Sequence, residues 1–211
     1  MAILHEATLV PSKLEMLESW LPSQPWFNSA ESTSVEAVGA YRFDDADGEV
    51  GIETHLLRTA NGRTYQVPLT YRGSPLRNAE SFLIDTSHHS VLGKRWIYDA
   101  SGDITYLTAL AATILGGGHE AELVVMTKNG PVRRDATTKV LGSGSRLSDI
   151  GVLEPLSLEN HDGSTWIITA DLRFVLSRVI KDKLGQGAEN ALSGTWPGQS
   201  EPAVLAFIQK T

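Results

Sequence analysis

The stretch VGIETHLLRTANGRTYQVPLTYR, residues 50–72, decides the fold because it reads as two β-strands around one tight turn. Asn61-Gly62 between two alternating runs is a strong hairpin signal, since a type I′ turn needs positive φ at both central residues. A two-residue loop pairs residues whose numbers sum to 123, so Ile52 faces Tyr71. This register predicts one wholly apolar face, which a slip of one residue would destroy.

Pro68 lies inside the second strand of this hairpin. Proline has no backbone N–H, and the missing donor would point away from the first strand. Proline is tolerated there at a sheet edge or beside an irregularity. The sequence therefore predicts an interruption of strand pairing on the outer side of Pro68.

Composition places the chain among ordinary globular proteins. It has 211 residues, 41% hydrophobic and 20% charged, with a formal net charge of −7. The acidic balance argues against nucleic acid or an anionic membrane as a partner. The absence of cysteine excludes disulfides and thiolate chemistry and is typical of a reducing cytoplasm. We expect a cytoplasmic protein, with no signal peptide and no membrane span.

Two helices are predicted, near residues 12–21 and 103–115. The first begins with a capping box formed by Ser12 and Glu15, and the second begins at Asp103 as N-cap. The triple glycine after residue 115 is a helix C-cap rather than a phosphate loop, because it follows a helix and lacks the lysine of that motif. The aromatic pair Trp26-Phe27 either packs on the sheet, which we favour, or binds a sugar or partner.

The remainder of the chain reads as short strands separated by turn signals. These predict an α+β fold, with antiparallel sheets and a C-terminal half that is mostly a β meander. We expect residues 1–118 and 119–211 to form two regions packed as one compact unit. The segment 142–153 is the preferred linker, although it can equally be a loop.

Catalytic motifs are not evident in the sequence. The adjacent pair His88-His89 on a strand points to opposite faces and cannot easily chelate one metal, so we expect no metal site and no cofactor. Two carboxylates such as Asp85 and Asp99 could still converge for acid–base chemistry. A speculative ligand pocket, for a sugar or a nucleotide, would be lined by polar and aromatic residues: Arg72, His88, Trp96, Tyr98 and Asp99. The competing interpretation is that Trp96 and Tyr98 fill the core.

Four segments together resemble a known family. They are SWLPSQPWF (residues 19–27), TYQVPLTYRGSPL (64–76), HSVLGKRWIYDASGDITYL (89–107) and LSGTWPGQSEPAVLAF (192–207). They are similar to the N-terminal cap domain of actinobacterial maltokinases, and more closely to short stand-alone proteins built on that cap. The cap-like similarity covers roughly residues 1–118, and its third segment is the most specific.

The resemblance implies an antiparallel sheet with helices, in the context of maltose, trehalose or glycogen metabolism, and without catalytic groups of its own. The phosphate cradle, positioning base and metal ligands of a kinase would lie beyond the cap, and none is visible before the chain ends at Thr211. We therefore do not expect kinase activity.

Two classes of function follow. The first is a non-catalytic binding, interaction or regulatory module, whose partner is an enzyme of glucan, maltose or trehalose metabolism, or a second copy of the chain. The alternative is a small-ligand binding protein, or an unrecognised acid–base enzyme, that uses the pocket near Arg72, Trp96, Tyr98 and Asp99.

Overall fold

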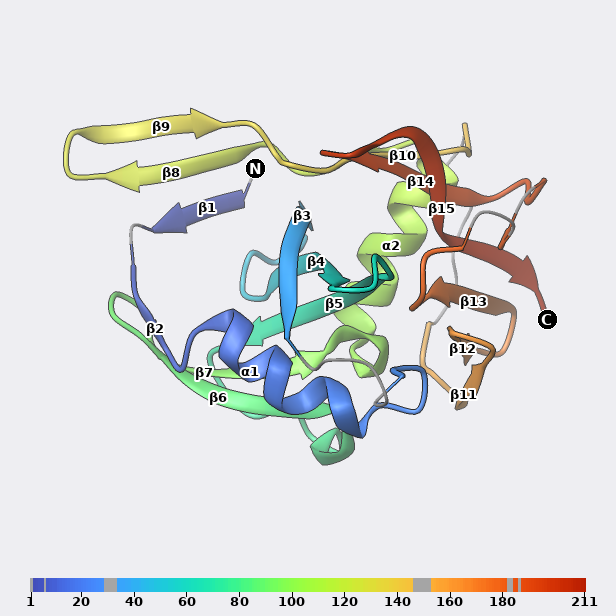
Figure 1. Cartoon of the computed structure of the whole chain (residues 1–211), viewed down its shortest axis with the longest axis horizontal. Coiled ribbons are helices and arrows are strands. Elements are labelled where there is room, and N and C mark those ends of the chain that lie inside the picture. The colour runs from blue at the N-terminus through green and yellow to red at the C-terminus, as the bar shows by residue number, and fades with distance from the viewer. Residues whose placement is uncertain (1, 6, 29–33, 146–152, 182–183, 186) are drawn as a thin grey trace.

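The computed structural model describes residues 2–5, 7–28, 34–145, 153–181, 184–185 and 187–211. β-Strands are the commonest structure among these residues and pair mostly in the antiparallel direction, and two α-helices accompany the sheets. The predicted α+β class is confirmed. Figure 1 shows the N-terminal sheet and the C-terminal strands on either side of helix α2.

The chain contains two long helices, three short 3-10 helices and fifteen strands among its described residues. In order they are β1 (Ala2–His5), β2 (Leu9–Val10), α1 (Lys13–Trp20), η1 (Leu21–Ser23), β3 (Val35–Phe43), β4 (Gly51–Thr59), β5 (Thr64–Arg72), η2 (Glu80–Phe82), β6 (Leu83–His89), β7 (Gly93–Asp99), η3 (Ala100–Gly102), α2 (Ile104–Gly116), β8 (Leu123–Thr127), β9 (Gly130–Arg134), β10 (Lys139–Gly142), β11 (Ser157–His161), β12 (Ser164–Ile168), β13 (Leu172–Ser177), β14 (Ala191–Trp196) and β15 (Gln199–Lys210).

The N-terminal sheet has the strand order β2-β6-β7-β5-β4-β3, and all of its pairs are antiparallel. Helix α1 packs on one face, where Leu17 and Leu21 join a core with residues of β4, β5 and β7. The predicted capping box is present, because the Ser12 side chain accepts from the Glu15 N–H and the Glu15 carboxylate accepts from the Ser12 N–H. Trp26 and Phe27 pack against Tyr65 in the same core, as preferred above.

Helix α2 lies on the opposite face of the sheet. Asp103 caps its N-terminus, and Gly117 ends it in the left-handed conformation at φ 66°. Its buried side chains share one core with Tyr41, Ile52 and Leu56 of the N-terminal sheet and with residues of β12 to β15. Both faces of the N-terminal sheet are therefore covered at β4 and β5.

The hairpin register predicted from the sequence is wrong by one residue. In the structure Ile52 pairs with Thr70, and Leu56 pairs with Gln66, so the paired numbers sum to 122 rather than 123. Ile52 and Leu56 face α2, whereas Tyr65, Val67 and Leu69 face α1. The predicted single apolar face does not exist, because this hairpin is buried on both sides.

The loop explains the difference. The Gly62 N–H donates to the Thr59 carbonyl at 2.9 Å, and the Thr59 N–H donates to the Arg63 carbonyl at 3.0 Å. Residues 60–62 therefore form a three-residue loop, in which Gly62 alone has positive φ, at 85°. This is the type I turn followed by a left-handed glycine, which also favours the sequence Asn-Gly.

The prediction at Pro68 is confirmed. Strand β5 pairs with β7 from Leu69 to Arg72, and that pairing stops next to the proline. Beyond the break the outer edge of β5 pairs with the C-terminal half, because the Gln66 N–H donates to the Arg178 carbonyl at 2.8 Å. Pro68 thus marks the point where one neighbour of β5 replaces another.

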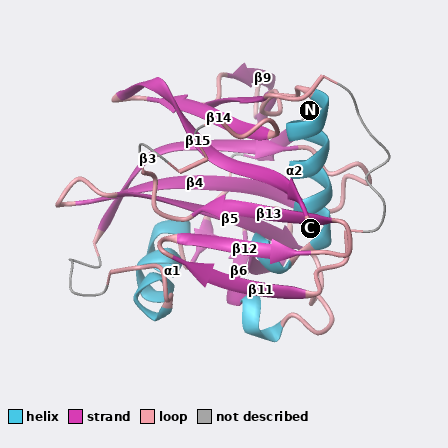
Figure 2. Ribbon diagram, turned by 90° about the vertical axis from the view of Figure 1, so that its right-hand side faces the viewer, coloured by secondary structure: helices cyan, strands magenta, loops and turns pink. Residues whose placement is uncertain are grey.

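The C-terminal strands form a second antiparallel sheet with the order β10-β14-β15-β13-β12-β11, seen in Figure 2. The β14–β15 hairpin folds back so that β15, not β14, lies beside β13. Strands β8 and β9 do not join this sheet. They form a separate sheet with β1, which pairs with β8 in parallel and projects from the rest of the molecule (Figure 1). Most of the preferred linker, residues 146–152, lies outside the described residues.

Candidate functional site

Arg72 and Asp99 are both engaged in ion pairs. Arg72 Nε and Nη2 donate to the two carboxylate oxygens of Asp103 at 2.7 Å each. Burial would raise the pKa of Asp103, but the hydrogen bonds from Arg72 keep it below its usual value. Since Asp103 also caps α2, Arg72 anchors the start of that helix to β5.

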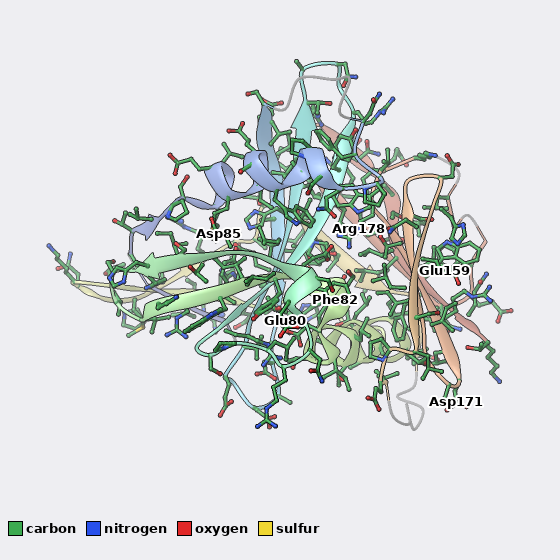
Figure 3. All side chains as sticks on the ribbon, turned by 90° about the horizontal axis from the view of Figure 1, so that it is seen from below. Glu80, Phe82, Asp85, Glu159, Asp171 and Arg178 are labelled. Atoms are coloured by element: carbon green, nitrogen blue, oxygen red, sulfur yellow. The ribbon has the colours of Figure 1, made fainter. Side chains whose placement is uncertain are left out.

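Asp99 lies on the other side of the sheet and pairs with Arg178, a residue of the C-terminal half. One Arg178 nitrogen, Nη2, is 2.8 and 2.6 Å from the two Asp99 oxygens, and Arg178 Nε donates to Thr165 Oγ1 at 2.8 Å. The guanidinium also lies over the Trp26 ring, at 4.9 Å from its centroid. Arg178 is 1% exposed, and Figure 3 shows it between the two large sheets. These contacts hold the two halves of the chain together.

Trp96, Tyr98 and His88 lie on strands β6 and β7. Tyr98 is buried, and its hydroxyl oxygen accepts from the Leu76 N–H at 2.9 Å. Trp96 is half-buried, with Lys94 Nζ 4.9 Å from its ring centroid, and His88 is exposed. Alternation along β7 puts Trp96 and Tyr98 on one face and Asp99 on the other. This arrangement does not favour one pocket lined by all five predicted residues.

A cleft of about 750 Å³ lies elsewhere in the molecule, between the β3–β4 loop, the β6–β7 turn, the segment around β2 and Met126 of β8. Its polar lining includes Lys13, Arg42, Tyr71 and Arg95. Asp44, Asp45 and Glu49 lie on the β3–β4 side. Leu9, Leu92 and Met126 supply an apolar wall.

Beneath this cleft the buried Glu53 carboxylate gathers three basic side chains on one oxygen. Glu53 Oε2 accepts from Lys13 Nζ, lies 3.0 Å from Arg42 Nη2 and lies 3.3 Å from His55 Nε2. Burial raises the pKa of Glu53, but Arg42, His55 and Lys13 outweigh it and hold the pKa well below the usual range. Burial and the Glu53 charge raise the pKa of Tyr71, so its hydroxyl keeps its proton.

Arg95 reaches the cleft from β7. Its Nη2 donates to the Leu92 carbonyl at 2.5 Å, and a Cβ at Gly73 would lie 3.0 Å from its Nη1. Its Nε is buried, and no described group accepts a hydrogen bond from it. Among the described residues, no carboxylate oxygen lies within ion-pair distance of Arg95.

Sequence reasoning missed this cleft. Lys13 lies at the start of a helix, and Arg42, Glu53 and Arg95 lie on three strands that alternate in the ordinary way. Their convergence depends on the strand order, which local patterns do not specify. The sequence contains one signal of this cleft. Glu53 is a charged residue inside a predicted strand, and the residues on either side of it, Ile52 and Thr54, are uncharged.

The described residues contain no group of three or more His, Asp or Glu side chains placed to hold a metal ion. No helix in the described part of the chain is long and apolar enough to cross a membrane.

The fold defines an α+β protein whose curled N-terminal sheet carries a helix on each face. Residues 20–103 match the family model of the maltokinase N-terminal cap domain, which confirms the resemblance predicted from the sequence. The matched range runs from the end of α1 to the N-cap of α2 and so contains strands β3 to β7. No curated protein matches the chain.

Proposed function

We propose that this protein is a non-catalytic interaction module, related to the maltokinase cap, that acts in the cytoplasm on an enzyme of maltose, trehalose or glycogen metabolism. The match of residues 20–103 to the cap domain is the observation that carries the proposal. A non-catalytic role is supported by two of the candidate pocket residues in that range, because Arg72 and Asp99 are occupied in internal ion pairs.

The interaction face that we propose is the surface of β2, β6 and β7 opposite α1. Val10 pairs with His88, and His88 pairs with Lys94, so the three lie in one row on this face. Val10 is 65% exposed. The half-buried Trp96 lies two residues after Lys94 on β7 and therefore shares its face. An aromatic ring flanked by an aliphatic and two basic side chains suits an acidic partner surface with an apolar centre.

The test is direct binding of the whole chain to three purified enzymes, a maltokinase, a trehalose synthase and a glycogen branching enzyme, by surface plasmon resonance. We expect saturable binding to one of them. Lys94→Glu should weaken it by at least about tenfold, because charge reversal at an interface costs more than about 1.4 kcal/mol.

Lys128→Glu, in the β8–β9 turn, is the matched control and should leave binding unchanged. Saturable binding to none of the three enzymes would overturn the proposed partner class. Transfer of phosphate from ATP to maltose by the purified chain would overturn the non-catalytic role.

A further inference from the structure

The cleft above Glu53 has the dimensions of a small-molecule site. Its volume of about 750 Å³ falls within the range of roughly 300–1,000 Å³ that is usual for such sites. It also combines an apolar wall with a few convergent polar groups, which is the usual composition of a ligand pocket.

We define the floor of the cleft as the part lined by the basic side chains of Lys13, Arg42 and Arg95. The buried Glu53 carboxylate, which accepts from Lys13 Nζ and lies 3.0 Å from Arg42 Nη2, offsets part of their positive charge. A guanidinium has five N–H donors and no acceptor. Arg95, which lines the cleft, uses one of them on the Leu92 carbonyl, and its buried Nε does not face the cleft, so its remaining Nη donors are the ones that can meet an anion. The floor therefore has donors and positive charge available for an anion.

The acidic side of the cleft limits which anions fit. Asp45 accepts hydrogen bonds from the N–H groups of Asp47, Glu49 and Val50, so its carboxylate is held within its own turn. Asp44 and Glu49 complete this side. Three carboxylates at the edge repel a polyanion but tolerate a ligand that directs one anionic group to the floor.

The opposite wall suits an uncharged body. Leu92 is 46% exposed and Met126 is 41% exposed, and both line the cleft together with Leu9. Covering such side chains with a ligand removes apolar surface from water, which favours binding.

We propose that this cleft binds a small organic anion, with one phosphate or carboxylate group held by Arg95 and Arg42 and an uncharged body against Leu9, Leu92 and Met126. The cleft takes Leu9 from β2 and Arg95 from β7, but alternation along these strands places them on the face opposite Val10 and Lys94, which form the interaction face. Binding of an anion in the cleft can therefore be tested independently of the proposed protein partner.

Isothermal titration calorimetry of the whole chain with phenyl phosphate, benzoate and benzyl alcohol tests the proposal. At least one of the two anions should bind saturably, and neutral benzyl alcohol should bind at least tenfold more weakly. The comparison of phenyl phosphate with benzoate decides which anionic group the site prefers.

Arg95→Gln should weaken anion binding by about tenfold or more, because it removes a charge-assisted hydrogen bond. Arg134→Gln, on the exposed strand β9, is the matched control and should bind as the parent does. Leu92→Glu places a carboxylate at the exposed mouth and should weaken binding without touching the floor, so it decides the case if Arg95→Gln fails to fold. Saturable binding of neither anion, or unchanged affinity in both variants, would overturn the proposal.

Discussion

The ion pair between Asp99 and Arg178 joins residues 79 positions apart in the chain, and both side chains are buried. Removing one member of such a pair leaves an uncompensated buried charge, which typically costs about 3–5 kcal/mol. Asp99→Asn should therefore lower the free energy of unfolding by about 3 kcal/mol, measured by urea denaturation.

The double variant Asp99→Asn/Arg178→Met should be less destabilised than the sum of its single variants, because it leaves no charge unpaired. Asp162→Asn removes one partner of the exposed Lys181–Asp162 pair and provides the control, with an expected change below about 1 kcal/mol. An equally small loss in Asp99→Asn would contradict the structural role of the buried pair.

The depressed pKa of Glu53 predicts that the stability of the folded protein falls at acidic pH. Its pKa is depressed in the folded protein, so the stability it contributes is fully present above the ordinary glutamate value of 4.5. That contribution is lost as the pH falls through the lower folded value, because the folded state must then give up a favoured charge. The melting temperature of the parent should drop steeply below pH 4.5, when measured by circular dichroism.

Glu53→Gln should be less stable than the parent at pH 7 by about 3 kcal/mol, because Lys13 and Arg42 lose their shared counterion. Its melting temperature should also fall less between pH 5 and pH 3, since the group that titrates is gone. A parallel fall in both proteins would show that Glu53 is not the acid-sensitive group.

At the scale of elements, the sequence identified what local chemistry determines. The capping box at Ser12, the N-cap at Asp103 and the break at Pro68 each follow from the preferences of one or two residues. The hairpin register did not follow, because Asn61-Gly62 suits both a two-residue and a three-residue loop. In the structure the Asn61 side chain accepts from Thr59 Oγ1 at 2.5 Å and from the Arg63 N–H at 3.2 Å, contacts that fix the longer loop.

Burial of β4 and β5 on both faces also removed the criterion used to choose the register. Apolar residues of this hairpin satisfy either register, because each face meets a core. An alternating pattern determines the register only where one face is solvated. The helix on the second face and the strand order of the C-terminal sheet are set by contacts between distant residues, which no local pattern encodes.

Gly142 marks close packing between β10 and the end of α2. An added Cβ would collide with the carbonyl oxygen of Thr113, a backbone atom of the helix. Gly142→Ala should therefore destabilise the protein by about 2–3 kcal/mol, as forced overpacking does. The measurement is the midpoint of urea unfolding.

Gly48→Ala is the comparison, because a Cβ there meets nothing within 4 Å although φ is +72°. Gly48→Ala should lower the free energy of unfolding by only about 1 kcal/mol, the penalty for placing a residue with a Cβ in the left-handed conformation. Similar losses in the two variants would mean that the helix end moves to accommodate the methyl group.

At the scale of the whole molecule, the cleft and the Asp99–Arg178 pair share one property that hides them from sequence reasoning. Each draws residues from elements that are adjacent only after the chain has folded: α1, β3, β4 and β7 in the cleft, and the β7 end with the β13 end in the pair. Asp99 was nominated as a site residue because of its polar chemistry. Its partner Arg178 gave no local signal, because the contact crosses between the two halves.

Gln66 makes a further connection between the halves. It is fully buried, its Nε2 donates to the carbonyls of Ser177 and Leu205 at 3.0 and 2.8 Å, and its Oε1 accepts from the Tyr41 hydroxyl at 3.0 Å. Together with the core shared by both large sheets, these bonds lead us to propose that residues 1–118 and 119–211 unfold as one cooperative unit.

Urea unfolding, followed by far-ultraviolet circular dichroism and by tryptophan fluorescence, tests that cooperativity. The fluorescence reports on both halves, because the first contains Trp20, Trp26 and Trp96 and the second contains Trp166 and Trp196. The two signals should have the same midpoint. Gln66→Leu should move both midpoints together to lower urea, because it leaves two buried carbonyls and a buried hydroxyl without their partner at a cost of about 1–3 kcal/mol for each group. Two separate transitions in the parent would show instead that the shared core and Gln66 join two units that are stable on their own.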